Sequence, residues 1–294
     1  MTHPPRILLC SAWQVVNIGD IAHTPGLLAL LETHFSEAEV TLWPYKPLTP
    51  AAITLMTQRF PRLRIVEGTV TAEGEASNPE LARAMDEADF FLHGSGPAML
   101  GWAQAEAFHR RTGRPFGVYG VTYGLYGIPE RATLSRTKFT YFRDSVSLVA
   151  AKRDGVNAPI TEWSPDAAFA ADLRDDARAE SFLRANDLQD GQFLCCISRL
   201  RHTPFWDMPT KNTPFDAARH ARNEAMKEHD HAPLLEAIIA VTRQTAMKVL
   251  LCPEDESQMA ITRDNLLAHL PADVKERVVW RETFWLPDEA ISVY

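Results

Sequence analysis

Short apolar runs alternate along this chain with longer segments whose apolar residues recur at helical spacing. Each run has the length of a buried strand and is apolar on both faces, which is typical of a parallel sheet covered by helices. The predicted strands are residues 6–12, 39–43, 63–67, 89–93, 116–121, 139–142, 193–199, 247–252 and 277–281. The alternating order predicts an α/β protein built on two doubly wound, Rossmann-like units with right-handed crossovers.

Capping residues mark where some of the intervening helices begin. Thr24 is followed by Pro25, a residue favoured in the first helical turn, so we expect a helix to begin at Thr24. Asp144 is expected to cap a helix over residues 145–153. Apolar residues at helical spacing predict a further helix over residues 232–245.

A change in composition divides the chain. Residues 173–190 are charged and contain no apolar run, so they predict a helix that links two domains. We therefore expect an N-terminal Rossmann-like domain over residues 1–172 and a C-terminal one over residues 191–294. Residues 200–230 contain several prolines and are predicted to form a long loop, a kind of segment that often acts as a lid or binding loop.

The second unit has fewer strands than the first. It supplies three predicted strands, whereas the first supplies six. Pro287 is well suited to the first position of a helix, but the chain ends at Tyr294, after about two turns. Such a helix would leave a sheet edge and an apolar face uncovered. We therefore expect the second unit to be truncated.

The composition is that of a globular protein, since 46% of the 294 residues are hydrophobic and 23% are charged. A net charge of −8 argues against a nucleic-acid-binding surface. No run approaches the roughly 18 apolar residues that cross a membrane, and the N-terminus lacks the pattern of a signal peptide. The four cysteines suit free thiols in a reducing compartment. We expect a cytoplasmic protein; association with the inner membrane face stays open.

The first candidate site follows the strand predicted at residues 6–12. Asn17, Gly19 and Asp20 lie between this strand and the next helix, where ligands bind in open α/β sheets. Gly19 allows close approach of the backbone, and nearby helix amides favour an anion. Asp20 would repel an anion, so it is a candidate for orienting a hydroxyl or transferring a proton. Ordinary turn chemistry explains the same residues equally well.

The second candidate site is the sequence His93-Gly94-Ser95-Gly96, between a predicted strand and a predicted helix over residues 98–111. Two glycines and a serine can form an anion-binding nest of backbone amides. The spacing matches neither the dinucleotide-binding fingerprint nor a Walker A loop. Glycines that serve only the turn geometry are an equal alternative. His93 is a candidate proton donor, although a polar strand end is the commoner explanation.

Arginines follow two further strands. Arg143 ends the predicted strand 139–142, and its guanidinium fork suits a phosphate or carboxylate. Asp144 is a candidate substrate contact, but its expected role as a helix cap explains it well. Arg199 and Arg201 end the first strand of the second unit and are its best candidates for binding an anion, with a solvated basic turn as the alternative.

No metal site is predicted. His229 and His231 lie in an acidic cluster, but they are two residues apart and would point to different faces of a helix. No C-x-x-C spacing occurs among the cysteines. We therefore expect neither a metal nor an organic cofactor.

Five segments, taken in order, resemble the polysaccharide pyruvyl transferase family. No single segment is specific; the order and spacing carry the resemblance, which covers most of residues 6–200. The segments are NIGDIA at residues 17–22, DFFLHGSG at 89–96, YGVTYG at 119–124, FRDSVSLVAAKRDGV at 142–156 and SPDAAF at 164–169. The chain departs from the family in two places: Ser95 replaces the middle glycine of a triplet, and the chain ends before the family's late Arg-x-His segment.

The resemblance implies a two-domain arrangement like that of GT-B glycosyltransferases. It also implies transfer of a pyruvyl group from phosphoenolpyruvate onto two sugar hydroxyls as a ketal, in the biosynthesis of a polysaccharide or exopolysaccharide. The acceptor would be a glycan or a lipid-linked sugar. On this basis Arg143, Arg199 and Arg201 are expected to hold the anionic donor with the glycine loops. Asp20 is the expected base and His93 a weaker proton donor.

Two other functions stay open. Paired Rossmann-like units would equally serve a glycosyltransferase that uses a nucleotide-sugar donor. The same fold also occurs in proteins without catalytic activity, because a fold does not fix a function. The sequence leaves the acceptor sugar and the oligomeric state, including a homo-oligomer, undetermined.

Overall fold

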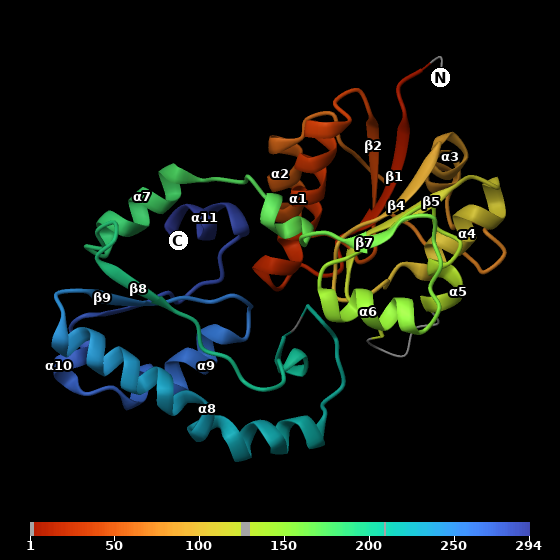
Figure 1. Ribbon diagram of the computed structural model, residues 1–294. Coiled ribbons are helices and arrows are strands. Elements are labelled where there is room, and N and C mark those ends of the chain that lie inside the picture. Colours follow the sequence, from red (N-terminus) through yellow and green to blue (C-terminus); the bar gives the residue numbers. More distant parts are fainter. Residues whose placement is uncertain (1–2, 125–129, 209) are drawn as a thin grey trace. The chain divides into compact units, whose positions relative to one another are not determined.

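The computed structural model describes residues 3–124, 130–208 and 210–294. The chain forms two units, one containing the residues up to Val15 together with Gly19–Leu173, and the other Val16–Ile18 together with Arg174–Tyr294 (Figure 1). Each unit is a parallel sheet with helices on both faces. The predicted class, mixed α/β with Rossmann-like units, is confirmed.

The first unit contains a seven-stranded parallel sheet in the order β3-β2-β1-β4-β5-β6-β7. The strands are β1 (Arg6–Ser11), β2 (Glu39–Pro44), β3 (Arg64–Ile65), β4 (Phe90–His93), β5 (Phe116–Val121), β6 (Thr140–Phe142) and β7 (Thr161–Trp163). The order reverses between β1 and β4, so the carboxyl ends of these two strands flank a topological switch point, where open α/β sheets bind their ligands.

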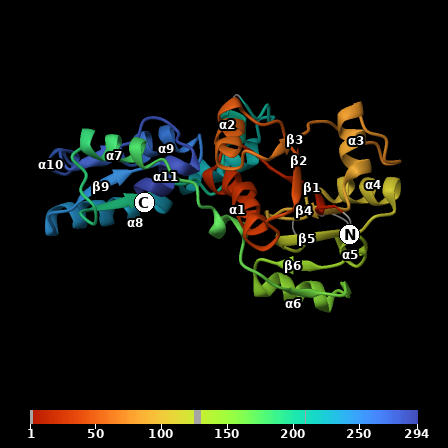
Figure 2. The ribbon, with the colours of Figure 1, turned by 90° about the horizontal axis from the view of Figure 1, so that it is seen from above.

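Helices cover both faces of this sheet. They are α1 (Ile18–His34), α2 (Pro50–Arg59), α3 (Pro79–Glu87), α4 (Trp102–Thr112), α5 (Glu130–Leu134) and α6 (Ser145–Arg153), with a 3-10 turn η1 (Ala167–Ala170). One apolar cluster joins the sheet to α1, α2 and η1, and a second joins its other face to α3, α4, α5 and α6. Figure 2 shows α1 and α2 on one side of the strands and α3 and α4 on the other.

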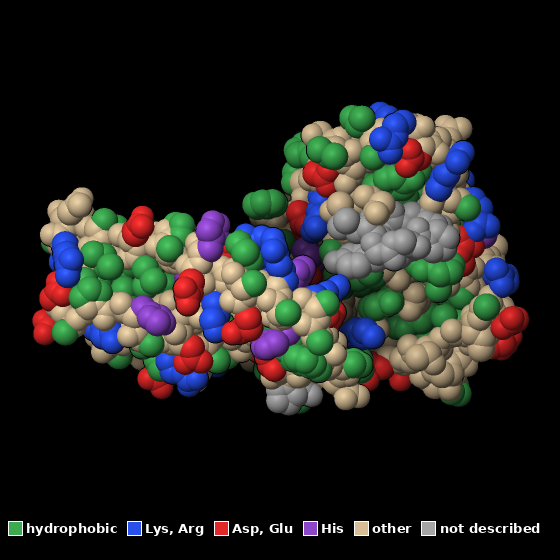
Figure 3. Space-filling model, turned by 90° about the horizontal axis from the view of Figure 1, so that it is seen from below, with side chains coloured by type: hydrophobic (Ala, Val, Ile, Leu, Met, Phe, Trp, Pro, Cys, Tyr) green, Lys and Arg blue, Asp and Glu red, His purple; other side chains and the backbone are tan. Residues whose placement is uncertain are grey.

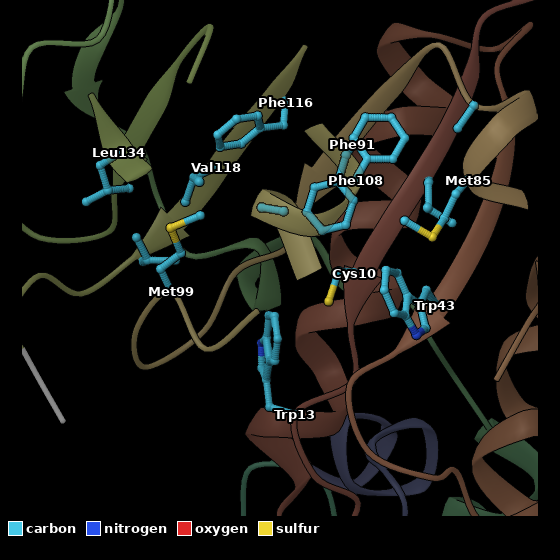
Figure 4. Packing of buried hydrophobic residues seen from close by; sticks show 14 of the residues in the cluster. Cys10, Trp13, Trp43, Met85, Phe91, Met99, Phe108, Phe116, Val118 and Leu134 are labelled. Atoms are coloured by element: carbon cyan, nitrogen blue, oxygen red, sulfur yellow. The ribbon is translucent and has the colours of Figure 1, made fainter. Parts of the chain in front are cut away.

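Aromatic side chains fill the second cluster (Figure 4). Phe91 of β4 is fully buried and lies 5.5 Å, ring centre to ring centre, from Phe108 of α4. Trp13, which follows β1 in the chain, belongs to the same cluster. Its ring stacks on His93 at a centroid distance of 4.6 Å. The loops at the carboxyl end of the sheet are therefore anchored to the core.

Two predicted helix starts have different outcomes. Asp144 caps α6 as predicted, since its carboxylate accepts from the Ser147 amide at 2.6 Å. The predicted start at Thr24 is wrong, because α1 already begins at Ile18. The Thr24 hydroxyl instead accepts from the Ala12 amide at 3.1 Å. This bond fixes the chain at the end of β1 against the second turn of α1.

The second unit has a three-stranded parallel sheet in the order β10-β9-β8. Its elements are β8 (Phe193–Cys196), β9 (Lys248–Leu251), β10 (Val278–Trp280), α7 (Asp176–Ala185), α8 (Ala217–Gln244), α9 (Gln258–Asn265), α10 (Ala272–Lys275) and α11 (Pro287–Val293), with 3-10 turns η2 (Phe205–Asp207) and η3 (Leu267–His269). Apolar side chains of α8, η3 and α10 cover one face, and those of α7 and α11 cover the other. Acidic and basic side chains are interspersed on the face of the molecule shown in Figure 3.

The expected loop over residues 200–230 is wrong in its second half. There α8 begins at Ala217, with Asp216 as its cap, and continues through Pro233. Residues 217–230 are mostly exposed, and their apolar residues are mainly alanines, so this part of the helix has no strong apolar face to signal it. Among the described residues, no helix is both long and apolar enough to span a membrane.

Candidate functional site

A cluster of polar side chains lies at the carboxyl end of the first sheet. Asp20 is in the first turn of α1, and the Gln14 side-chain amide donates a hydrogen bond to its carboxylate. One turn further along α1, the ring of His23 is 7% exposed, and its Nδ1 atom is 4.0 Å from Oδ1 of Asp20. This Nδ1 atom is buried, and no described residue forms a hydrogen bond with it.

Asp166 is the centre of the cluster, at the cap position of η1. Its Oδ1 atom accepts from the Ser95 hydroxyl at 2.6 Å and from the Ala168 amide at 2.9 Å. Its Oδ2 atom accepts from Nη1 of Arg143 at 2.8 Å and lies 3.3 Å from Nε2 of His23. Residues from four separate segments therefore meet on one carboxylate.

These contacts decide the charge of Asp166. Burial on its own would raise the pKa of this carboxyl, but hydrogen bonds from His23, Ser95 and Ala168 and the charge interaction with His23 lower it well below its usual range. The side chain therefore carries a full negative charge at neutral pH, and the groups around it serve as its donors.

The predicted glycine loop has a different arrangement from an anion-binding nest. Gly94 and Gly96 are buried, and their amides donate to the carbonyls of Cys10 at 2.8 Å and Gly120 at 3.2 Å. A Cβ atom at Gly96 would lie 2.4 Å from Nε1 of Trp13, so glycine is required for packing. Both amides are already paired and neither is available to an anion in this structure. Ser95, between them, bonds to Asp166.

His93 is fully buried with both ring nitrogens hydrogen-bonded. Its Nδ1 atom bonds to the Gly94 carbonyl at 2.8 Å, and Nε2 accepts from the Gly101 amide at 3.0 Å, which fixes the neutral tautomer. Burial lowers the pKa of His93 to about 3. The expected part in proton donation does not fit this geometry, because His93 is neutral and its only proton is held by a carbonyl.

Arg143 lies directly after β6 and is partly exposed. Its Nε atom donates to the Thr122 hydroxyl at 2.7 Å and its Nη1 atom to Asp166, and among the described residues Nη2 has no partner. The guanidinium is thus held on one edge, and its other edge has a donor that no described residue occupies. The neighbouring Asp144 has both carboxylate oxygens bonded within its own helix, to the amide and hydroxyl of Ser147.

Of the remaining candidates, Asn17, Arg199 and Arg201 lie in the second unit and Gly19 lies in the first. Asn17 forms a β-bridge with Asp255, and the next residue, Ile18, donates its amide to the Glu254 carbonyl at 2.9 Å. Gly19 begins the stretch of α1 that belongs to the first unit.

Arg199 and Arg201 differ in what holds them. Arg201 forms two hydrogen bonds to Asp230, at 2.6 and 2.9 Å, whereas Arg199 is exposed and makes no hydrogen bond within the described part of the chain. His229 and His231 are both on α8, and the ring of His229 bonds to Asp230 at 2.9 Å. No group of His, Cys, Asp and Glu residues suited to a metal ion occurs in the described ranges.

The sequence analysis missed His23 and Asp166 as site residues. His23 lies within a segment expected to precede the helix, so its position one turn after Asp20 could not be deduced. Asp166 belongs to the Ser-Pro-Asp segment that supports the family resemblance. Only the paired strands β6 and β7 reveal that it lies beside Arg143.

Solved structures resemble this chain in fold alone. UDP-GlcNAc 2-epimerase from Methanocaldococcus jannaschii is 12% identical, with a TM-score of 0.59 over 98% of this chain and 75% of its own. HepE from Anabaena, in complex with UDP-glucose, is 11% identical, with a TM-score of 0.55 over 94% and 68%. MnaA from S. aureus, with UDP, is 11% identical, with a TM-score of 0.55 over 98% and 71%. These similarities support a GT-B-type fold class.

The comparison with curated proteins finds no match. A family model described as polysaccharide pyruvyl transferase matches residues 17–294, which is nearly the whole chain. The match begins at the Asn-Ile-Gly-Asp segment and includes the Asp166 cluster. The chain belongs to the polysaccharide pyruvyl transferase family.

Proposed function

We propose that this transferase moves the pyruvyl group of phosphoenolpyruvate onto two hydroxyls of a sugar, forming a ketal. The observation that supports it is the guanidinium of Arg143, which Thr122 and Asp166 hold in place while Nη2 stays without a partner among the described residues. Phosphoenolpyruvate carries a phosphate and a carboxylate, and a fixed arginine fork is well suited to either group.

The reaction needs proton transfer at two kinds of atom. The methylene carbon of phosphoenolpyruvate gains a proton, and the central carbon then takes up two sugar oxygens. Each hydroxyl loses its proton, and the bond from the central carbon to the phosphate oxygen breaks to release inorganic phosphate. Asp20, a carboxylate at the carboxyl end of β1 and 18% exposed, is the proposed base.

Several parts of this proposal rest on the family alone. The acceptor is proposed to be a glycan or a lipid-linked sugar, and Arg199 is proposed as an anion-binding group of the second unit, where it is exposed. Arg201 is already paired with Asp230, so it would have to exchange partners to bind a substrate. For Asn17 and the loop glycines we propose only an effect on the conformation of the backbone.

Phosphate release from phosphoenolpyruvate in the presence of candidate glycans tests the function. We expect release with the correct acceptor and, in Arg143→Ala, a rise in KM for phosphoenolpyruvate of roughly 10- to 100-fold, the usual effect of losing a charge-assisted hydrogen bond. Arg153→Ala is the matched control, because that side chain is 74% exposed and forms its ion pair with the adjacent Asp154. Thermal stabilisation by UDP-glucose but not by phosphoenolpyruvate would instead favour a nucleotide-sugar enzyme.

A further inference from the structure

We propose that His23 is a positioning residue that acts through Asp20, and that Asp166, His23 and Asp20 form one chain for storing and returning a proton. This proposal rests on the proposed function, from which it takes its substrate. The three residues that carry it all lie in the first unit. The key observation is the buried imidazole of His23, which lies between two carboxylates and, in the described part of the chain, has one ring nitrogen without a hydrogen-bond partner.

Asp166 fixes the orientation of the imidazole. Its carboxylate is ionised and accepts the proton on Nε2 of His23, across 3.3 Å. An imidazole with its proton on Nε2 has a lone pair on Nδ1, and this atom is the one that lies 4.0 Å from Oδ1 of Asp20. Catalytic hydrogen bonds are often long before substrate binds and shorten in the complex. His23 can therefore take a proton from Asp20 or return one.

Close packing of α1 on η1 brings these groups together. Gly26 follows His23 by three residues on α1, and a Cβ atom at Gly26 would lie 1.9 Å from the Ala167 carbonyl oxygen. Any side chain at this position would push α1 away from η1, which carries Asp166 at its cap. A glycine in the middle of a helix costs stability, so its presence is explained by this contact.

The charged and titratable groups that face His23 are known from each neighbouring segment. Asp20 faces it from α1 and Asp166 from η1, and Arg143 reaches Asp166 from the end of β6. Tyr119 of β5 also interacts with Asp166, and burial raises the pKa of its phenol. At neutral pH its hydroxyl is uncharged, so the two carboxylates and the arginine dominate the field at the imidazole.

The proposed chain matches the proton balance of the reaction. One proton goes to the methylene carbon before any hydroxyl is deprotonated, and two hydroxyls later release two protons. Protonated His23 gives its Nδ1 proton to Asp20, and Asp20 gives it to the carbon. The first hydroxyl proton then passes through Asp20 back to Nδ1, and the second leaves with the phosphate. Asp166 stabilises the imidazolium whenever it forms.

The kinetic test uses His23→Gln, which keeps a side-chain N–H for Asp166 but has no titratable nitrogen. We expect kcat to fall roughly 100-fold, the typical contribution of acid–base catalysis, with KM for phosphoenolpyruvate little changed. We also expect one limb of the pH profile of kcat to disappear. His34→Gln is the matched control, because His34 lies exposed at the end of the same helix. An active wild type whose pH profile is unchanged in His23→Gln would overturn the inference and leave the proposed function intact.

A second measurement does not depend on turnover. NMR of the full chain should find the Nε2–H tautomer of neutral His23, because Asp166 accepts the proton on that nitrogen. An Nδ1–H tautomer would overturn the inference. Wild type that shows the Nε2–H tautomer but no reaction with phosphoenolpyruvate would count against the proposed function only.

Discussion

Arg143 and Asp166 connect the ends of two adjacent strands, with Nη1 of the arginine 2.8 Å from Oδ2 of the aspartate. Asp166→Asn keeps the shape of the side chain but leaves two donor groups, on the partly exposed Arg143 and the buried His23, without their charge partner. Removing one member of a buried ion pair typically costs about 3 kcal/mol or more. We expect urea denaturation of Asp166→Asn to give a free energy of unfolding lower by about that amount.

Asp172→Asn provides the comparison for this prediction. Asp172 also pairs with an arginine, Arg59, but its side chain is 48% exposed. Exposed ion pairs contribute about 0–1 kcal/mol, so this variant should be close to wild type. Equal losses in the two variants would mean that the position of Asp166 in the cluster has no special effect on stability.

The pKa values of His93 and Asp166 are both lowered in the folded protein, and they predict how the free energy of unfolding depends on pH. His93 is buried with a folded-state pKa of about 3, below the value of about 6.5 in the unfolded chain. Between these values the unfolded chain binds a proton that the native protein excludes, so stability falls as the pH decreases. Asp166 adds a loss in the same direction below about pH 4, because its pKa is lowered on folding.

The measurement is urea denaturation at pH 7 and pH 5. We expect the His93 contribution to the free energy of unfolding to be about 2 kcal/mol smaller at pH 5. In His93→Gln, which does not titrate, the difference between the two pH values should shrink by about this amount, whatever the overall stability of the variant. An undiminished pH dependence in His93→Gln would assign the effect to other groups.

Apolar runs predicted most strands, but the short edge strand β7 was missed. Buried strands such as β1 and β5 are recognisable because nearly every residue in them is apolar. Glu162 and Trp163 of β7 are exposed at the edge of the sheet, so no apolar run marks them. The start of α8 was missed for a similar reason, since the apolar residues of its first turns are mainly alanines among charged and polar residues.

The site was predictable only in part. Arg143 directly follows β6, and Asp20 lies in the first turn of the helix after β1, so the rule that ligands bind at the carboxyl ends of strands is sufficient to select them. His23 depends on where α1 begins, and Asp166 on the pairing of β7, and neither is encoded in a local pattern. His93 shows the opposite case, because a histidine at a strand end looks catalytic until its burial and its two hydrogen bonds are known.

The position of Gly26 predicts that a larger side chain there would disturb the packing of α1 on η1. A methyl group at this position would lie 1.9 Å from the Ala167 carbonyl oxygen, a backbone atom that cannot rotate away. Although alanine is the better helix former, overpacking of this kind typically costs 1–3 kcal/mol. We expect Gly26→Ala to unfold at a lower temperature than wild type, and the His34→Ala change on the exposed end of α1 to have little effect. A more stable Gly26→Ala would show that α1 can move away from η1 at no cost.

We expect the hydroxyl of Ser95 to stabilise the centre of the cluster through its hydrogen bonds. Its Oγ atom donates to Oδ1 of Asp166 at 2.6 Å and accepts from the Ala167 amide at 3.2 Å, and it lies 3.0 Å from the Gly120 carbonyl oxygen. Ser95→Ala leaves these groups short of a partner at a fully buried position, which typically costs about 1–3 kcal/mol. Loss of this hydrogen bond should also raise the pKa of Asp166 toward its usual value.

Denaturation and carboxyl-carbon NMR of Ser95→Ala measure these two effects, with Ser36→Ala on the exposed surface as the control. The two measurements are informative together because they separate two roles of the same hydroxyl. A loss of stability with an unchanged Asp166 titration would mean that Ser95 supports the backbone of η1 alone. A shift of the titration as well would mean that the family's central loop residue, a serine in this chain, tunes the carboxylate that holds both His23 and Arg143.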